Sequence, residues 1–302
     1  MPRAPYRPPA LRWQVFLARD AVDGGLISPD ALRSAAWRRL LRGVYADSRL
    51  EPDHQLQCHA ARLLAPPEAV IAGASAAYLH GIQAAVRNGD PVQLLVERKH
   101  RFGPVQGLQV HTTGTLPAGD LASGPELRRT TGMRTAWDVA RWQDQVRSVP
   151  TLDAMLRAGL VTAGDLAAYA RQHRDGGAPG AVRAARAFQL ADGRAQSPPE
   201  SVLRVRLVLR GILPPVPQHP VVVRSGRVLH PDLAWPEYQV GLEYEGARHA
   251  EPDRLHLDRR RLNALADAGW LILHATSHHL GPGFATLVQD LRRALRSRGA
   301  PI

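Results

Sequence analysis

Four acidic residues in the last third of the chain lie where predicted helices and strands begin or end. Glu200 follows S-P-P in the first turn of a predicted helix, and Asp232 lies in H-P-D-L-A-W-P at the start of a predicted strand. Glu243 and Glu245 lie in V-G-L-E-Y-E-G, so the alternation of a strand places both carboxylates on one face. These residue types and positions predict an acidic site.

Carboxylates gathered at strand ends supply the oxygen ligands that a hard divalent ion requires, and they leave positions open for water and a substrate phosphate. The alternative is that each acid lies on the surface or pairs with one of the many arginines. For Glu200 alone we favour that alternative, because a carboxylate also suits a helix N-terminus. An apolar run that ends in two same-face carboxylates, as at Glu243 and Glu245, is costly to bury unpaired. For Asp232 with Glu243 we favour metal ligands.

Basic residues follow these acids along the chain. His249 comes after a glycine turn, and L-D-R-R-R-L-N lies on a predicted helix, where Asp258 and Arg261 share a face. Asp258 and Arg261 could form an ordinary surface ion pair. Alternatively, Arg261, with Arg259, could bind a phosphate oxygen. Helix position alone leaves both interpretations open.

The elements that would position the acidic residues follow a polar boundary at 191–199. Apolar runs and breaking glycines predict a helix, three strands, a helix, a strand and a closing helix. This order is typical of an α/β sandwich. The expected ranges are 199–210, 216–223, 228–235, 240–244, 253–268, 270–275 and 284–298.

The first 48 residues predict a small module of a different kind. Residues 11–20 have the pattern of a short helix, and Ser28-Pro29-Asp30 opens a second one. W-R-R-L-L-R-G-V-Y-A-D then alternates like a strand or tight hairpin. This order indicates a winged-helix-like module, or else a structural cap on the middle domain. As a DNA-binding module it would contact phosphates through Arg33, Arg38, Arg39 and Arg42.

The whole chain is therefore predicted to be an α/β (α+β) multidomain protein. A winged-helix-like module at 1–48 precedes a middle region at 49–190, which is α/β and then helical, and a third domain covers 197–302. In the middle region we expect helices at 53–64, 151–159, 162–173 and 181–190, and strands at 92–96 and 108–111.

Composition narrows the class of protein. The formal net charge is +12, which favours nucleic-acid partners, although arginine in place of lysine also marks a GC-rich genome. Cys58 is the single cysteine, which excludes an internal disulfide framework and a multi-cysteine zinc site. We find neither a secretory signal nor an apolar run that could cross a bilayer, so we expect a cytoplasmic protein.

Four segments in order carry a family resemblance at about residues 197–280. S-P-P-E-S-V-L-R, H-P-D-L-A-W-P-E, V-G-L-E-Y-E-G-A-R-H and L-D-R-R-R-L-N-A-L-A-D-A-G-W-L-I-L together resemble a bacterial domain of unknown function. That domain is related to the very-short-patch-repair endonucleases of the PD-(D/E)XK nuclease-like superfamily. The resemblance implies a restriction-endonuclease-like fold.

The resemblance also implies a Mg²⁺-dependent phosphodiesterase site, in which Mn²⁺ could replace Mg²⁺. Asp232 matches the metal-binding aspartate, Glu243 the glutamate of the D/E-x-K pair and Glu200 the helix glutamate. His249, Asp258 and Arg261 match further favoured positions. Glu245 stands where the superfamily has its lysine, so it is another ligand, or Arg259, Arg261 or His249 takes the lysine's role, or the chemistry is altered or absent.

The first two thirds resemble another group. G-L-I-S-P-D-A-L-R, W-R-R-L-L-R-G-V-Y-A-D, A-G-A-S-A-A-Y-L-H-G and R-T-T-G-M-R-T-A-W-D-V-A resemble the AbiEi-like antitoxins of type IV toxin–antitoxin systems over about residues 11–190. The resemblance implies a winged-helix DNA-binding domain joined to a second domain, with the Gly-Val-Tyr motif in the wing.

Two functional hypotheses from different classes follow. The first is a DNA-binding protein with a metal-dependent endonuclease-like domain, acting in phage defence or DNA repair. The second is a non-enzymatic antitoxin or autorepressor with a cognate toxin, which uses the nuclease-like fold for binding. A nucleotidyltransferase is disfavoured, because no G-S is followed closely by paired aspartates.

Overall fold

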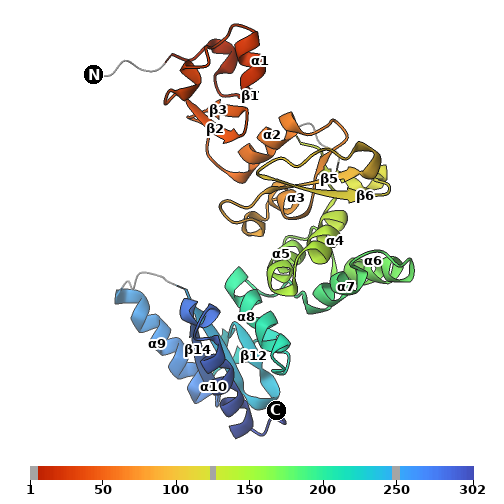
Figure 1. Ribbon diagram of the computed structural model, residues 1–302. Helices are drawn as coiled ribbons and strands as arrows, with labels where there is room; N and C mark the ends of the chain where they lie inside the picture. The colour runs from red at the N-terminus through yellow and green to blue at the C-terminus, as the bar shows by residue number, and fades with distance from the viewer. Residues whose placement is uncertain (1–5, 123–126, 247–251) are drawn as a thin grey trace. The chain divides into compact units, whose positions relative to one another are not determined.

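The computed structural model describes residues 6–122, 127–246 and 252–302, with side chains except at 175 and 252–259. It has the predicted mixed α/β, multidomain architecture, with several mixed and antiparallel sheets. Two compact units divide the chain at residues 139 and 140 (Figure 1). The predicted middle region 49–190 is therefore shared between the two units.

The first unit begins with a three-stranded antiparallel sheet of strand order β1-β3-β2. The predicted hairpin is present, with Gly43 at φ 78° between its strands. The predicted helix at 11–20 is wrong, because Val15–Leu17 pairs with Val44–Ala46 and helix starts only at Ala18. The elements are β1 (Val15–Leu17), α1 (Ala18–Asp23), β2 (Trp37–Leu41) and β3 (Val44–Asp47).

The second predicted N-terminal helix is only one turn long. Ser28 Oγ accepts a hydrogen bond from the backbone N–H of Ala31 at 3.2 Å, as an N-cap does, but the helix is a 3-10 turn over Ala31–Arg33. Between this cap and β2 there is no room for more helix. Within residues 6–48 the module therefore has a hairpin but no long recognition helix.

A five-stranded sheet of order β6-β5-β4-β8-β7 forms the rest of the first unit. Asp53 caps the predicted helix at 53–64 by accepting a hydrogen bond from Leu56 N at 2.7 Å. β5 and β6 pair in parallel, as buried strands with apolar runs often do. The elements are α2 (His54–Leu64), β4 (Val70–Ile71), α3 (Gly73–Leu79), β5 (Val92–Glu97), β6 (Leu108–Thr113), β7 (Leu121–Ala122) and β8 (Arg129–Thr130).

Helices connect this sheet to the last one. Asp144 and Thr162 act as N-caps, each accepting a hydrogen bond from a backbone N–H three residues ahead. The division between the two units falls inside α4, so the helices after it belong to the second unit. The elements are α4 (Gly132–Trp142), α5 (Gln145–Arg157), α6 (Ala163–Asp175) and α7 (Ala181–Leu190).

The second unit also contains a four-stranded sheet of order β14-β13-β12-β9. The predicted strands at 216–223 and 228–235 are each broken in two, because the end of the first and the start of the second form a separate hairpin of β10 and β11. The elements are α8 (Pro198–Leu209), β9 (Val216–Pro217), β10 (Val221–Val222), β11 (Val228–Leu229), β12 (Leu233–Trp235), β13 (Val240–Glu245), α9 (Pro252–Asp267), β14 (Leu271–Thr276) and α10 (Phe284–Ser297).

Helices pack on both faces of this sheet (Figure 1). Leu233 and Leu242 belong to the core formed with α8 and α10, whereas Ala234 and Ile272 pack with Leu265 of α9. Because side chains alternate along a strand, Asp232 and Glu243 leave the sheet on the side that α9 covers. The fold thus places both acids under one helix.

A buried ion pair joins α5 to α8. Asp153 Oδ2 accepts a hydrogen bond from the Arg204 guanidinium at 2.7 Å, and the two side chains are 1% and 7% exposed. Asp153 Oδ1 accepts from Asp192 N at 2.7 Å, and Arg204 also donates to the carbonyl of Leu190. Both charges are therefore compensated inside the protein.

Replacement of Arg204 by methionine should lower the free energy of unfolding by about 3–5 kcal/mol, because it leaves a buried carboxylate without its cation. Urea unfolding followed by circular dichroism measures the change. Arg293→Ala is the control: its ion pair with Asp290 is exposed, so a loss below about 1 kcal/mol is expected. Equal losses for the two variants would contradict this role of the buried pair.

Candidate functional site

Asp232 and Glu243 come together at the end of an antiparallel strand pair. In the register of β12 and β13, Leu233 faces Leu242, and continuing it by one pair places Asp232 opposite Glu243. Asp232 Oδ2 accepts a hydrogen bond from Tyr244 N at 2.8 Å. Burial raises the pKa of Glu243, and the charge of Asp232 adds to that rise. The two carboxylates therefore interact.

Glu200 lies buried at the start of α8, where Ser197 is the N-cap. Its carboxylate accepts hydrogen bonds from Ser197 Oγ at 2.7 Å and from Gln196 N at 2.9 Å. Burial raises its pKa although these bonds oppose the rise, and Asp232 again contributes as a neighbouring negative charge. Glu200 thus belongs to the same acidic cluster as Asp232.

Gln218 links two of these acids, and sequence reasoning missed it. Its Nε2 lies 3.3 Å from Glu200 Oε2 and 3.1 Å from Asp232 Oδ1, and its backbone N–H donates to Asp232 O at 3.1 Å. Its φ of 52° is unusual for a residue other than glycine. The only signal in the sequence was an amide between Pro217 and His219, in a segment that we expected to be a plain strand.

Arg261 of α9 binds Glu243. Its guanidinium lies 2.8 Å from Glu243 Oε1 and also donates to the backbone carbonyl of His230. Helix spacing predicted that Arg261 pairs with Asp258, but the side chain of Asp258 lies outside the described residues. This arginine lowers the pKa of Glu243 against the larger effect of burial. The arrangement gives one carboxylate of the pair a cationic partner.

Glu245 of β13 has a histidine as its neighbour. Glu245 Oε1 lies 2.7 Å from Nδ1 of His274, without the alignment of a hydrogen bond. β13 and β14 are parallel, with Glu243 beside His274 in the register. His274 was missed by sequence reasoning, although it is the polar residue in the apolar strand L-I-L-H-A-T. It adds a titratable group to the acidic face.

The remaining predicted residues of this site are only partly described. His249 lies outside the described residues, and Arg259 lies in α9 without a described side chain. Among the side chains that the structure describes, no three of the histidine, cysteine, aspartate and glutamate type lie close enough together to hold a metal ion. The described site is therefore a pair of facing carboxylates with polar supports.

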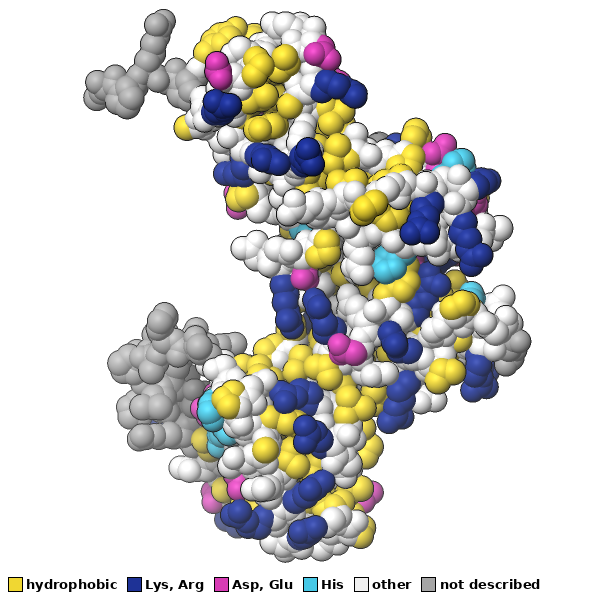
Figure 2. Space-filling view, in the orientation of Figure 1, with side chains coloured by type: hydrophobic (Ala, Val, Ile, Leu, Met, Phe, Trp, Pro, Cys, Tyr) yellow, Lys and Arg dark blue, Asp and Glu magenta, His cyan; other side chains and the backbone are white. Residues whose placement is uncertain are grey.

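The four arginines predicted to contact DNA have different surroundings. Arg33 lies 3.6 Å from Asp30 on the surface, and Arg38 donates to the carbonyls of Leu50 and Ser48 at 2.8 and 3.2 Å. Arg39 and Arg42 are exposed on the hairpin, and neither pairs with a carboxylate among the described side chains. Figure 2 shows basic side chains well in excess of acidic ones on the visible face.

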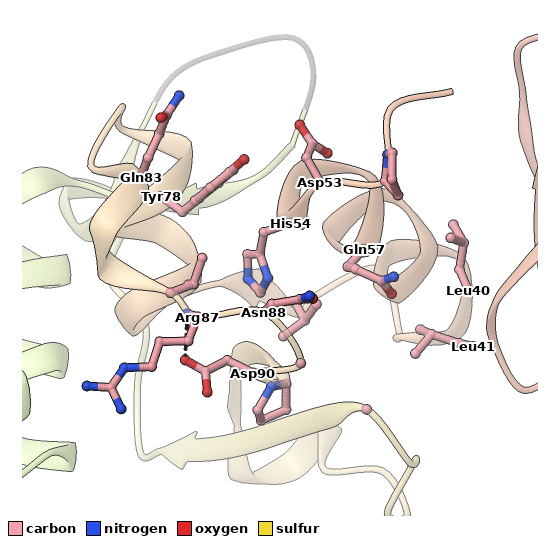
Figure 3. A pocket seen from close by; sticks show the side chains of 16 residues that line it. Leu40, Leu41, Asp53, His54, Gln57, Tyr78, Gln83, Arg87, Asn88 and Asp90 are labelled. Atoms are coloured by element: carbon pink, nitrogen blue, oxygen red, sulfur yellow. Dashed lines mark hydrogen bonds between the residues drawn. The ribbon is translucent and has the colours of Figure 1, made fainter. Parts of the chain in front are cut away.

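A cavity of about 470 Å³ in the first unit was not predicted (Figure 3). Asp53, His54, Tyr78 and Asp90 are among the residues that line it. His54 Nε2 lies 2.8 Å from the buried Ser75 Oγ, and burial lowers the pKa of His54 although Asp90 and Asp53 oppose this. The cavity has the size of small-ligand sites and is lined by both hydrogen-bond donors and acceptors.

Fold and site together define a mixed α/β protein with facing carboxylates at the end of two antiparallel strands. Two proteins of Mycobacterium tuberculosis are similar to the chain: uncharacterized protein MT2308 of strain CDC 1551 / Oshkosh and uncharacterized protein Rv2248 of strain ATCC 25618 / H37Rv. Each is 31% identical over 242 residues, which cover 78% of this chain and 83% of the relative. The chain belongs to the family of these mycobacterial proteins. No protein-family model matches it.

The raised pKa of Glu243 makes its contribution to stability depend on pH. The folded state keeps the proton to higher pH than the unfolded chain does, so stability falls as pH rises from the unfolded value near 4.5 through the folded pKa. The pKa of Glu243 is raised even though Arg261 attracts its charged form, so the ionised side chain lowers the stability of the folded state. Glu243→Gln removes that charge and should raise the melting temperature at neutral pH. The gain should disappear below the unfolded pKa.

Differential scanning calorimetry of wild type and Glu243→Gln across this pH range tests the expectation. Glu237→Gln, an exposed site in the same sheet region, provides the matched control. A variant that is less stable than wild type at neutral pH would show that Glu243 is better compensated than its burial indicates.

Proposed function

We propose that the chain is a DNA-binding protein whose second unit carries a metal-dependent phosphodiesterase site of the endonuclease type. The observation that carries the proposal is the facing pair Asp232 and Glu243 at the end of β12 and β13. The order α8, strands, α9, β14, α10 agrees with the resemblance to very-short-patch-repair endonucleases. A role in phage defence or DNA repair in the cytoplasm would follow from this activity.

The acidic pair suits a divalent cation in ligand type and in charge. Both groups offer hard oxygen ligands. Burial, with a smaller contribution from the charge of Asp232, raises the pKa of Glu243, and a bound cation would favour its charged form. Mg²⁺ often uses only one or two carboxylates and completes its shell with water and phosphate oxygens. Asp232 and Glu243 would hold Mg²⁺ or Mn²⁺. The bound ion would lower the pKa of a water molecule and neutralise charge on the phosphate.

The surrounding residues have supporting roles in this proposal. Tyr244 N and Gln218 fix the orientation of the Asp232 carboxylate, one on each oxygen. Glu200 accepts hydrogen bonds from three donors, and we assign it to holding Gln218 in place. Such outer contacts of metal ligands commonly contribute about 10- to 100-fold to activity.

Arg261 supplies the positive charge that the missing lysine would have given. Arg261 is 35% exposed, so a phosphate oxygen can reach its guanidinium. His274, next to Glu243 in the register of the two parallel strands, brings an imidazole ring to the same face of the sheet.

A second candidate function is a non-enzymatic antitoxin or autorepressor with a cognate toxin. The observation that favours it is the ion pair between Arg261 and Glu243, which satisfies this carboxylate without a metal ion. Glu245 in the position of the lysine points the same way. In this case the acidic face would serve binding, and DNA contact would survive loss of the carboxylates.

Purified protein should nick or cleave plasmid or mismatched DNA only with Mg²⁺ or Mn²⁺. Asp232→Asn and Glu243→Gln should each lower the rate at least about 100-fold, since each removes charge stabilisation at the reacting centre. Gln218→Ala should lower it about 10- to 100-fold. Gel assays of initial rates measure the effects, with Glu237→Gln as the matched control. If the wild-type protein binds DNA but leaves it intact with either ion, the endonuclease proposal is wrong and the non-enzymatic function remains.

DNA binding should depend on the hairpin arginines. Each phosphate that the protein no longer neutralises reduces the slope of log K against log salt by about 0.9, so Arg39→Ala with Arg42→Ala should reduce it by about 1.8. Fluorescence anisotropy with a duplex at several salt concentrations measures the slope. Arg19→Ala is the control, because Arg19 already pairs with Asp20 at 3.1 Å on the same module. An unchanged slope in the double variant would refute the role of these two arginines.

A further inference from the structure

Trp13 is an exposed tryptophan held in a conformation that tryptophan seldom adopts. It is 55% exposed, and its φ of 58° lies in the left-handed region. A bulky side chain in this region is strained, and such strain persists only where the surrounding structure holds it. An aromatic ring of this size on the surface marks a contact site more often than a random position does.

The structure that holds Trp13 is the buried carboxylate of Asp47 at the end of β3. Asp47 Oδ2 accepts a hydrogen bond from Trp13 N at 3.0 Å, and Asp47 itself is fully buried. The same carboxylate binds Arg7 Nε at 3.2 Å and the guanidinium of Arg49 at 2.5 Å. The hydrogen bond from the Arg49 side chain, together with those from the backbone of Trp13 and Arg49, holds the pKa of Asp47 far below the usual range. Asp47 therefore fixes the tryptophan backbone and two arginines together.

Arg49 lies over the indole ring. Its guanidinium carbon is 4.1 Å from the ring centroid, which is cation–π distance, and Asp47 holds it there. One face of the ring is thus covered by a cation while more than half of the side chain stays exposed. Two arginines against one buried carboxylate, with Arg12 exposed beside them, leave this surface positively charged.

We propose that Trp13 and Arg49 form a stacking platform for an unpaired base of DNA. A base offers a flat face to the open side of the indole, and its backbone phosphates offer negative charge to Arg49 and Arg12. A paired base in a duplex has no free face, so the platform selects single-stranded or distorted DNA. This inference rests on the proposed DNA-binding function and specifies the form of DNA that the first unit recognises.

The exposed hairpin arginines belong to the same small sheet as the element that holds Trp13. Trp13 lies at the Asp47 end of β3, whereas Arg42 precedes the opposite end. The two ends of this four-residue strand are about 10 Å apart. A strand of a few nucleotides can therefore reach both, with its base on Trp13 and its phosphates on Arg42.

Equilibrium binding to two single strands tests the platform. The probes are an oligothymidylate of about twelve nucleotides and an abasic strand of the same length, which keeps the phosphates and lacks the bases. Wild type should bind the oligothymidylate more tightly. Trp13→Ala should weaken that binding about 5- to 100-fold, the value of one stacked base, and change abasic binding less than about twofold. Trp13→Phe should keep most of the affinity.

Tryptophan fluorescence gives a second readout with a folded conservative variant. Oligothymidylate should quench the emission of wild type more than that of Trp13→Phe. Equal loss of affinity for both strands in Trp13→Ala, or equal quenching in wild type and Trp13→Phe, would overturn the platform. Equal affinity of wild type for the two strands would overturn the platform alone, whereas failure to bind either strand or duplex would overturn the proposed function.

Discussion

Two carboxylates facing each other across an antiparallel strand pair are the constraint around which the second unit is organised. Like charges at such a position repel, and burial makes the repulsion stronger. Hydrogen bonds from neighbouring groups offset this repulsion. Tyr244 N and Gln218 donate to Asp232, and Arg261 of α9 donates to Glu243. The same arrangement that stabilises the two acids would also orient them for an ion in the proposed function, so stability and proposed activity draw on the same contacts.

Much of the fold could be predicted from the sequence because its signals are local. Asp53, Ser197 and Thr162 are N-caps whose side chains bond the helix backbone, and glycines such as Gly211 and Gly269 lie at positive φ just after helices. The helix predicted at 11–20 was wrong for the opposite reason. Val15–Leu17 pairs with a strand about 30 residues away, and a pairing over that distance leaves no local signal.

The candidate site was predictable only in its charged strand residues. Asp232 and Glu243 stand out because acids interrupt apolar runs, and strand register brings them together. Gln218 and the carbonyl of His230 could not be found in this way, because their roles depend on a loop that turns back onto the sheet. The pairing of Arg261 with Glu243 rather than within its own helix depends in the same way on how α9 packs.

The ion pair between α5 and α8 ties the acidic sheet to the helices before it. Arg204 lies one helical turn after Glu200, so the segment that anchors α8 also sets the position of a carboxylate in the site. A fragment beginning at residue 197 would carry this guanidinium without Asp153 and without the carbonyl of Leu190. Cutting the chain at that boundary would therefore destabilise α8, whose Glu200 contacts Gln218. The isolated fragment would differ in its acidic site from the same residues within the intact chain.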